Sequence, residues 1–565
     1  MSTAAFAPEY TYIAVLGVIC GFIFAFGIGA NDVANAFGSS VSARSLKLWQ
    51  AIILGSIFEF LGAILLGATV TSTIRSKIFD VNLYEDEPEI VLLGMMTSIL
   101  ASTLLLLGAT FFGLPVSTTH TVVGAIMGFS ICAKGFPSIN WDVAIQIFIS
   151  WVISPAVAGV IALAFFVPLR LFVLRHENAY QRAYLTFPIV LLIGVGIDLF
   201  YVLYKAGSNF NAAEALPLYV VLPASFGFGA VCGLLWLKPV GPFTMKRINA
   251  RLDGTGKNNS TVHEVHEDDK PESAPETVPS VNIGHTGDSS EDEEEACDFD
   301  EEEDKKVNFD EEEGGVTAGI PLRATPEQED SDREGDDDAQ EGEPKTTKRK
   351  SLLHQMSSKF VENTYGQDLH SQSMHENPEA ASIWEAGEVF DPHAEQLFTY
   401  VQVFTACLNS FAHGANDVSN AIAPISAIIA IYQTGELSSK APVQKWILAY
   451  GGIGIVLGLL LYGYKVMKSL GFKVTILSPS RGACAELAAS LFVVTASFLG
   501  IPVSSTQCIV GAVAGVGVAG GRKNVQWLFL LRVCVGWVGV FFAAVVVSAG
   551  IFSFVAFSPS LAAPM

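Results

Sequence analysis

Long apolar runs separated by short polar segments occupy most of this 565-residue chain. A helix needs about 20 apolar residues to cross the hydrocarbon core of a bilayer. The fourth and eleventh runs are short and follow their neighbours through G-L-P and G-I-P, which favours half-helices of re-entrant hairpins. The pattern predicts an all-α polytopic membrane protein of about 12 transmembrane segments, re-entrant hairpin halves included. The runs lie near 12–30, 48–70, 90–112, 116–133, 142–167, 185–204, 217–237, 397–413, 445–464, 483–500, 503–520 and 526–556.

Two polar phrases occur twice along these runs. Residues 29–35 read G-A-N-D-V-A-N and residues 414–420 read G-A-N-D-V-S-N. Residues 114–120 read L-P-V-S-T-T-H and residues 501–507 read I-P-V-S-S-T-Q. Aligning the phrases sets the first five runs opposite the last five, with equivalent runs seven places apart. Because seven is odd, the two copies must face opposite ways across the membrane, which predicts two inverted repeats.

The acidic charge of the chain is confined to one insert. The formal net charge is −23, although the mean hydropathy is positive at +0.43. Between Arg251 and Glu395 there are 41 acidic and 12 basic residues. Such a segment cannot bury enough apolar surface to fold alone, and nothing in it predicts a nucleic-acid partner. The predicted parts are membrane repeat 1 at 10–170, two linking transmembrane helices at 185–240, an acidic, largely disordered loop at 250–395, and membrane repeat 2 at 396–558.

Lysine and arginine in the short loops predict the orientation. With the N-terminus outside, fifteen of these residues fall on the inner side and six on the outer side. Cytoplasmic loops carry the excess of Lys and Arg. We therefore expect the long loop to be cytoplasmic and both termini to be extracellular, in a multi-pass protein of the plasma membrane.

The repeated G-A-N-D phrases place acids where they are costly. An acid in an apolar run needs a partner or an ion. Because Asp and Asn favour turns over helix interiors, we expect a broken helix at each phrase, with freed carbonyls. Carboxylate, amide and carbonyl oxygens suit sodium or a proton better than a transition metal. Helix–helix hydrogen bonding by Asn is the alternative, but two matched copies favour a cation site. The candidates are Asp32, Asn31, Asn35, Asp417, Asn416 and Asn420.

The proline–hydroxyl phrases are typical of helix starts. Proline suits the first helical turn, and Ser and Thr serve as N-caps. A helix N-terminus offers free N–H groups and a partial positive charge, which suits an anion. Two such starts from inverted repeats would point at each other, with a tetrahedral oxyanion between them. Ordinary capping of two half-helices is the alternative. The candidate hydroxyl donors are Ser117, Thr118, Thr119, Ser504, Ser505 and Thr506.

Two further acids, one in each half, have no acidic counterpart in the other half. Glu59 is aligned with Ile455, and Glu486 is aligned with Ile99. Both interpretations stay open: they are gating or relay groups, or they pair with a hydroxyl or a nearby base. Asp198 has no counterpart in the other half and is interpreted as structural or interfacial.

Two histidines abut the repeated phrases. His120 and His413 are interpreted as hydrogen-bonded packing residues, with pH sensing as the alternative. An intramembrane enzyme would need a nucleophile and a base, and Ser117 near His120 is the one candidate pair. The second half has Gln507 in place of that histidine, so we expect no enzyme.

The paired phrases, in this order, resemble those of the inorganic phosphate transporter (PiT) family, and the layout resembles its fungal sodium-dependent branch. The resemblance covers roughly 10–240 and 395–558 and excludes the insert; one departure is Ala423-Pro424, where many relatives have Gly-Pro. It implies symport of phosphate with sodium, or with protons in some members. It further implies that Asp32 and Asp417 lie at cation sites, that the hydroxyl phrases hold phosphate, and that Glu59 and Glu486 are transport-critical acids.

We therefore predict a phosphate symporter that works by alternating access around a midplane site, with sodium as co-substrate and no cofactor. Proton coupling and sulfate as substrate are the alternatives. Phosphate can donate a hydrogen bond to a carboxylate, which sulfate at neutral pH cannot. A receptor or scaffold acting through the acidic loop is a third class. A homodimer is compatible with a bundle this rich in small residues, although no motif predicts it.

Overall fold

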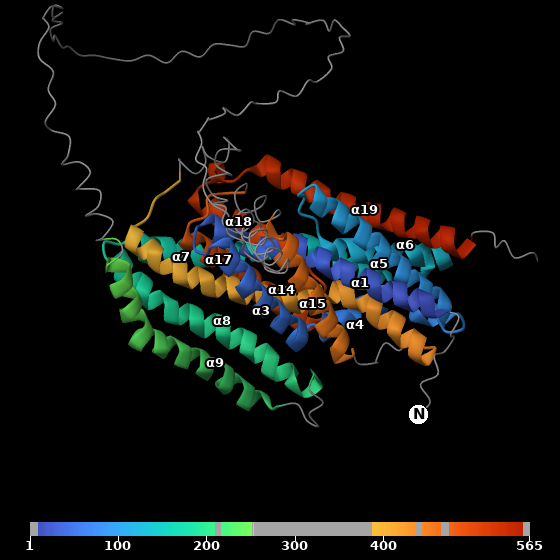
Figure 1. The fold of residues 1–565 in the computed structure, drawn as a ribbon. Helices are drawn as coiled ribbons and strands as arrows, with labels where there is room; N and C mark the ends of the chain where they lie inside the picture. Colours follow the sequence, from blue (N-terminus) through green and yellow to red (C-terminus); the bar gives the residue numbers. More distant parts are fainter. Residues whose placement is uncertain are drawn as a thin grey trace, which may run out of the picture. The chain divides into compact units, whose positions relative to one another are not determined.

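The computed structural model describes residues 10–209, 216–250, 252, 387–436, 443–464 and 474–557, without the side chains of 34–35 and 206–209. This part of the chain is helical, with one isolated bridge between Phe79 and Ile139 and no longer strand. Most of the acidic loop predicted at 250–395 lies outside the described residues. The account below therefore concerns the membrane body (Figure 1).

All twelve apolar runs form helices, as the sequence predicted. Ten helices of the described residues are long and apolar enough to span a membrane, whereas α6 and α18 have 17 and 16 residues. The helices are α1 Thr11–Asn31, α2 Val33–Ser42, α3 Leu48–Leu66, α4 Ala68–Ser76, α5 Pro88–Phe111, α6 Thr118–Lys134, α7 Trp141–Leu169, α8 Ala179–Asn209, α9 Leu218–Leu235, α14 Pro392–Thr434, α15 Lys445–Tyr462, α17 Pro479–Leu499, α18 Ser505–Gly520 and α19 Trp527–Phe557.

The two short helices begin in the same way. Gly113 and Gly500 end the preceding helices at φ +66° and +72°, a conformation that favours glycine. The chain then runs through the prolines to an N-cap serine. The hydroxyl of Ser117 accepts from the backbone N–H of His120, and the hydroxyl of Ser504 accepts from that of Gln507, both at 3.3 Å. The phrases therefore build two capped helix starts, each folded back beside the helix before it.

Helices of the two halves pack against each other in a crossed manner. Helix α6 packs on α19 and α18 on α7, while α3 packs on α14 and α1 on α15. A Cβ added to Gly29 would lie 1.8 Å from the carbonyl oxygen of Ile455, and one added to Gly414 would lie 2.2 Å from that of Glu59. These matched contacts bring the G-A-N-D phrases against the positions that the sequence alignment paired.

The expected break of the helix is wrong at the second G-A-N-D phrase and is confirmed only as a one-residue interruption at the first. Helix α14 continues through the second copy without interruption. In the first copy Asp32 separates α1 from α2, yet its φ and ψ are −89° and −39°, and its N–H still donates to the carbonyl of Ile28 at 2.8 Å. The Asp and Asn side chains bond to other helices rather than to their own backbone. These side chains therefore do not compete with the helical backbone hydrogen bonds, which is the effect that favours a turn.

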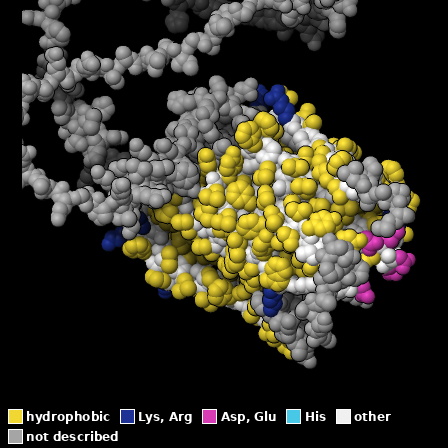
Figure 2. All heavy atoms as spheres, turned by 45° about the vertical axis from the view of Figure 1, so that its right-hand side comes forward, with side chains coloured by type: hydrophobic (Ala, Val, Ile, Leu, Met, Phe, Trp, Pro, Cys, Tyr) yellow, Lys and Arg dark blue, Asp and Glu magenta, His cyan; other side chains and the backbone are white. Residues whose placement is uncertain are grey.

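The outer helices present apolar side chains to the surroundings. Figure 2 shows one broad face of the molecule covered by hydrophobic side chains. In the most apolar stretches of α7 and α19, only 28% and 17% of the residues are buried within the chain. In the most apolar stretch of helix α14, by contrast, 89% of the residues are buried. This helix lies at the centre of the bundle (Figure 1). The polar phrases are thus enclosed, while the periphery suits hydrocarbon.

Candidate functional site

The two helix starts meet inside the bundle. The hydroxyl of Thr119, in the first turn of α6, donates to the backbone carbonyl of Val503, just before α18, at 3.1 Å. The structure thus brings together the two tips that the sequence predicted to face each other. All six candidate hydroxyl residues are buried: Ser117, Thr118, Thr119, Ser504, Ser505 and Thr506.

Asp32 lies between the two tips and receives hydroxyls from both halves. Thr118 of α6 donates to its Oδ2 at 2.6 Å, and Thr506 of α18 donates to its Oδ1 at 3.4 Å. The side chain is 1% exposed. The carboxylate is thus buried and accepts hydrogen bonds from hydroxyls of both tips, and burial of a charged group is costly unless it is paired.

Asp417 is held in the equivalent way by the second half. Its Oδ2 accepts from the hydroxyl of Ser505, the counterpart of Thr118. Its Oδ1 accepts from the amides of Asn416 at 3.1 Å and Asn420 at 3.0 Å. Each repeated aspartate therefore bonds to the first helical residue of the tip in its own half.

Asn420 connects the second aspartate to the first tip. Its amide donates to the hydroxyls of Thr118 at 3.2 Å and Thr119 at 3.1 Å, in addition to Asp417. The side chain of its counterpart Asn35 lies outside the described residues. Asn420 thus ties helix α14 to the start of α6, across the boundary between the halves.

The two remaining asparagines hold the extended segments before the tips. The amide of Asn31 donates to the carbonyl of Leu114 at 3.0 Å, and its oxygen accepts from the N–H of Val116 at 3.2 Å. Asn416 donates to the carbonyl of Val503, the counterpart of Val116, at 2.6 Å. Asn31 therefore faces the loop rather than the aspartates, while Asn416 contacts both loop and aspartate.

His413, which the sequence analysis interpreted as a hydrogen-bonded packing residue, is buried and contacts two acids. His413 Nδ1 lies 2.9 Å from Glu59 Oε2, and its Nε2 lies 2.9 Å from Asp417 Oδ2, without hydrogen-bond geometry in the second case. Ser410 donates to Glu59 Oε1 at 2.9 Å. The sequence could have indicated the contact between His413 and Asp417, because residues four apart lie on the same face of a helix.

Glu486 is surrounded by neutral donors. Its carboxylate accepts from four side chains of α2 and α14, all missed by the sequence analysis: Ser39 at 2.6 Å, Ser40 at 2.7 Å, Thr405 at 2.8 Å and Gln402 at 3.2 Å. Of the two acids without a counterpart in the other half, Glu59 thus contacts a base, and Glu486 contacts hydroxyls and an amide.

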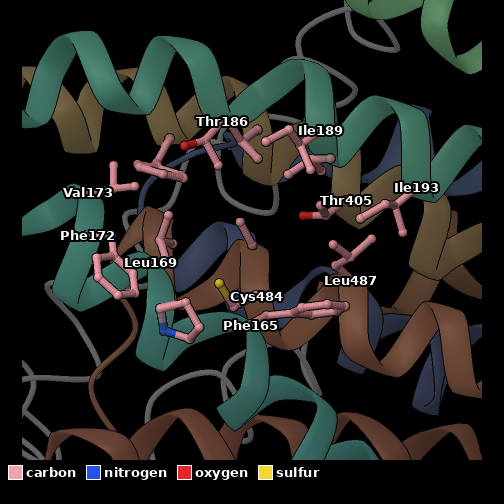
Figure 3. A pocket seen from close by; sticks show the side chains of 15 residues that line it. Phe165, Leu169, Phe172, Val173, Thr186, Ile189, Ile193, Thr405, Cys484 and Leu487 are labelled. Carbon is pink, nitrogen blue, oxygen red and sulfur yellow. The ribbon is translucent and has the colours of Figure 1, made fainter.

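An apolar pocket of about 290 Å³ lies beside the Glu486 network, between α7, α8, α14 and α17 (Figure 3). Thr405 and Leu487 line it, and the hydroxyl of Thr405 is bonded to Glu486. The other lining residues are mainly aliphatic and aromatic side chains. This pocket adds no charged group to the site.

The arrangement suits cations. One ligand atom each from Asp32, His413 and Asp417 lie within 4.8 Å of one another. With Glu59, three carboxylates gather here around a single imidazole, all of them buried. Burial penalises their charge, so protons or bound cations must balance it. Oxygen ligands favour a hard cation.

The other residues named from the sequence lie apart from this cluster. Asp198 of α8 is buried, with no hydrogen-bond partner among the described residues. The ring of His120 packs edge-on against Trp151, with the ring centroids 3.7 Å apart. Neither of its nitrogens bonds to Ser117, whose hydroxyl caps the helix instead. No nucleophile–base pair is formed between Ser117 and His120.

Fold and site together define a polytopic helical membrane protein of the secondary-transporter class, in which matched halves enclose polar groups at opposed helix starts. The model of the phosphate transporter family matches residues 28–548, and the chain belongs to that family. The resemblance found in the sequence is thereby confirmed.

Similar proteins match almost end to end. The phosphate-repressible phosphate permease pho-4 of Neurospora crassa is 30% identical over 94% of this chain and 95% of its own length. Sodium-dependent phosphate transporter 2 of Homo sapiens is 30% identical, over 95% of this chain and 98% of its own. A solved structure described as "The sodium-dependent phosphate transporter" has the same fold, with a TM-score of 0.66 at 24% identity, covering 97% of this chain and 100% of that one.

Proposed function

We propose that this protein imports phosphate across the plasma membrane by sodium-coupled symport. The observation that carries the proposal is the meeting of two capped helix starts with Asp32 and Asp417 bonded to their first turns. Repeats at 10–170 and 396–558 rock about this centre and expose it to each side in turn. Relatives named as phosphate and sodium-dependent phosphate transporters support the choice of both ions.

Phosphate binds at the two tips. The free N–H groups of α6 and α18 and the hydroxyls of both phrases supply donors to a tetrahedral oxyanion. In the present arrangement Thr118 and Ser505 donate to carboxylates instead. A hydroxyl can rotate between partners, so these two residues are the proposed exchange points between cation site and anion site.

Sodium binds at the repeated aspartates. Asp32 and Asp417 supply carboxylate oxygens, and the amide oxygens of Asn35 and Asn420 complete the set. Because Asn31 and Asn416 hold the loops, we assign them the positioning of the tips rather than direct ligation. A cation here offsets the charge of both the carboxylates and the incoming anion.

Proton coupling is the second candidate, favoured by one observation. His413 lies between Glu59 and Asp417, within 2.9 Å of each. An imidazole changes its charge near neutral pH more readily than any other side chain. This contact offers a route by which a proton could replace sodium as the coupling ion.

The proposal also covers the orientation of the chain in the membrane and the distinction between a transporter and an enzyme. The long loop is cytoplasmic and both termini are extracellular, as the loop charges predict. The protein moves phosphate without chemical change, so it is a transporter and not an enzyme. A role as receptor or scaffold through the acidic loop is the alternative of another class.

Phosphate uptake into proteoliposomes tests the proposal. An inward sodium gradient should drive radiolabelled phosphate inward, a proton gradient alone should not, and sulfate should compete weakly. Asp32→Asn and Asp417→Asn should reduce coupled uptake to background, because each removes one carboxylate. Asp142→Asn, an exposed acid at the start of α7, serves as the control that keeps full uptake. Retained sodium coupling in both site variants would falsify the cation assignment.

A further inference from the structure

A cavity of about 510 Å³ lies beside the two tips, away from the aspartates. We call it the tip cavity. Helix α7 packs on α18 and helix α19 on α6, and these four helices line it. Matched positions of the two halves contribute to it: His120 and Gln507 from the first turns of α6 and α18, and Trp151 and Trp537 from α7 and α19.

These four side chains carry polar atoms without hydrogen-bond partners. Both ring nitrogens of His120, Oε1 of Gln507 and the indole N–H groups of Trp151 and Trp537 lack a partner among the described residues. His120, Gln507 and Trp537 are only 2%, 4% and 4% exposed. Buried polar groups are nearly always hydrogen-bonded, so a convergent set of unpaired ones points to a bound molecule. That molecule must both donate and accept hydrogen bonds.

The mouth of the tip cavity is lined by exposed apolar side chains. Val152 of α7 and Val538 and Phe542 of α19 line it and are 75%, 58% and 61% exposed. Both helices are apolar enough to span the membrane. Side chains of this kind at this position face lipid, so an occupant enters from the bilayer rather than from water.

The lining also selects against charged lipids. The described residues that line the tip cavity include no Lys, Arg, Asp or Glu. An ionised head group placed here would be buried without a counter-charge, which is strongly unfavourable. Aromatic rings of Phe148, Phe541 and the two tryptophans form much of the wall. A rigid, neutral hydrocarbon body fits such a wall, and the volume is within the range of small-molecule sites.

We propose that the tip cavity binds a neutral membrane lipid with a single hydroxyl group, of the sterol class. The hydroxyl accepts from an indole N–H and donates to Gln507 or His120. His120 and Gln507 each follow a tip residue directly, Thr119 and Thr506, so the lipid contacts the same helical turns as the transport site. This proposal concerns binding and stands whether or not the protein carries phosphate.

Photoaffinity labelling of the full-length protein in phosphatidylcholine liposomes tests it. The probe is a sterol carrying a diazirine and an alkyne, and labelled residues are located by peptide mass spectrometry. Labelling should map to the α7 and α19 residues of the tip cavity and be displaced by excess unlabelled sterol. The corresponding 3-oxo sterol, which cannot donate a hydrogen bond, should compete at least tenfold more weakly.

A pair of tryptophan variants isolates the polar contact. Trp151→Phe with Trp537→Phe keeps two aromatic rings but removes both N–H donors, so cavity labelling should fall at least tenfold. Trp527→Phe is the matched control on α19, because that indole N–H already donates to the carbonyl of Arg522 at 2.9 Å. Its labelling should equal that of the unaltered protein.

Several outcomes would overturn the proposal. Absence of labelling in the tip cavity of the unaltered protein would do so. Equal labelling of the double variant, once its elution profile shows it to be folded, would also do so. Equal competition by the 3-oxo sterol or by a fatty acid would show an unspecific hydrocarbon slot instead. The competition experiment needs no variant, so it remains decisive if the double variant misfolds.

Discussion

Buried acids in this protein are held by different kinds of neighbours. Asp32 accepts from hydroxyls of both halves, and Asp417 accepts from one hydroxyl and two amides of the second half. Glu59 contacts an imidazole, and Glu486 accepts from four neutral donors. A carboxylate surrounded by donors alone has nothing to balance its charge, whereas one beside a histidine can share a proton. We therefore propose that the contacts of Glu486 form a structural network and that those of His413 form an exchangeable one.

Replacement of Glu486 tests the structural network. Glu486→Gln puts an amide N–H group among hydroxyl and amide donors, so at least one buried donor loses its acceptor. We expect the free energy of unfolding to fall by about 1–3 kcal/mol, measured by thermal unfolding in detergent. Glu436→Gln, at an exposed residue, should leave the transition unchanged. An unchanged transition for Glu486→Gln would mean that the four contacts add little.

Replacement of His413 tests the exchangeable contact. His413→Gln keeps hydrogen-bonding atoms but removes the imidazole between Glu59 and Asp417. We expect the rate of phosphate uptake to fall at least tenfold, because an amide cannot carry a positive charge between two buried carboxylates. Uptake would be measured in proteoliposomes with a fixed sodium gradient. An unaltered rate of uptake would remove His413 from the coupling mechanism.

At the scale of the helices, close backbone contacts set the position of the site. Gly458 of α15 lies against the carbonyl of Phe26 in α1, and Gly62 of α3 lies against that of Phe411 in α14. A side chain at either place meets backbone, which cannot move aside as a flexible side chain can. These contacts fix how deeply the two G-A-N-D helices are inserted between their partners, and therefore where Asp32 and Asp417 meet the tips.

A methyl group at Gly458 tests the importance of this contact. Its Cβ would lie 1.8 Å from the carbonyl oxygen of Phe26, so the helices must separate. We expect Gly458→Ala to destabilise the protein by about 3 kcal/mol or more and to reduce the monodisperse yield on size-exclusion chromatography. Gly539→Ala on α19, where a Cβ meets nothing within 4 Å, is the control and should behave normally. Similar yields for both variants would contradict the close contact.

At the scale of the whole molecule, the proposed site residues all come from the two membrane repeats. Asp32 and Thr118 belong to the first repeat, and Asp417 and Ser505 belong to the second. The match to the family model spans 28–548 and includes both of these positions in each repeat. We therefore expect transport to depend on the two membrane repeats.

Deletion of the loop distinguishes a transporter from a scaffold. Removal of residues 260–380 should leave at least half of the sodium-driven phosphate uptake, because every proposed site residue is retained. A protein acting through its loop would lose its role. The shortened protein would be compared with the full chain at equal amounts in proteoliposomes. Complete loss of uptake, with normal elution of the shortened protein, would favour the scaffold.

The amino-acid sequence alone determined the twelve helical segments, because apolar length and turn residues are local properties. It also determined which aspartates and hydroxyls recur, since a repeated phrase needs no coordinates. The meeting of the two tips could be inferred from the parity of the runs. Local reasoning failed at the G-A-N-D phrases, where α14 stays helical because its polar side chains find partners on other helices.

Only the tertiary structure decided which neighbours each acid has. The contacts of Glu486 with Ser39 and Ser40 join residues 447 and 446 positions apart, and that of Glu59 with His413 joins residues 354 apart. No local pattern encodes a pairing across such a separation, because it depends on how the two halves interlock. The tip cavity is likewise a product of packing: Trp151 and Trp537 are ordinary aromatic residues in the sequence, and only the crossed helices place them side by side with the tips.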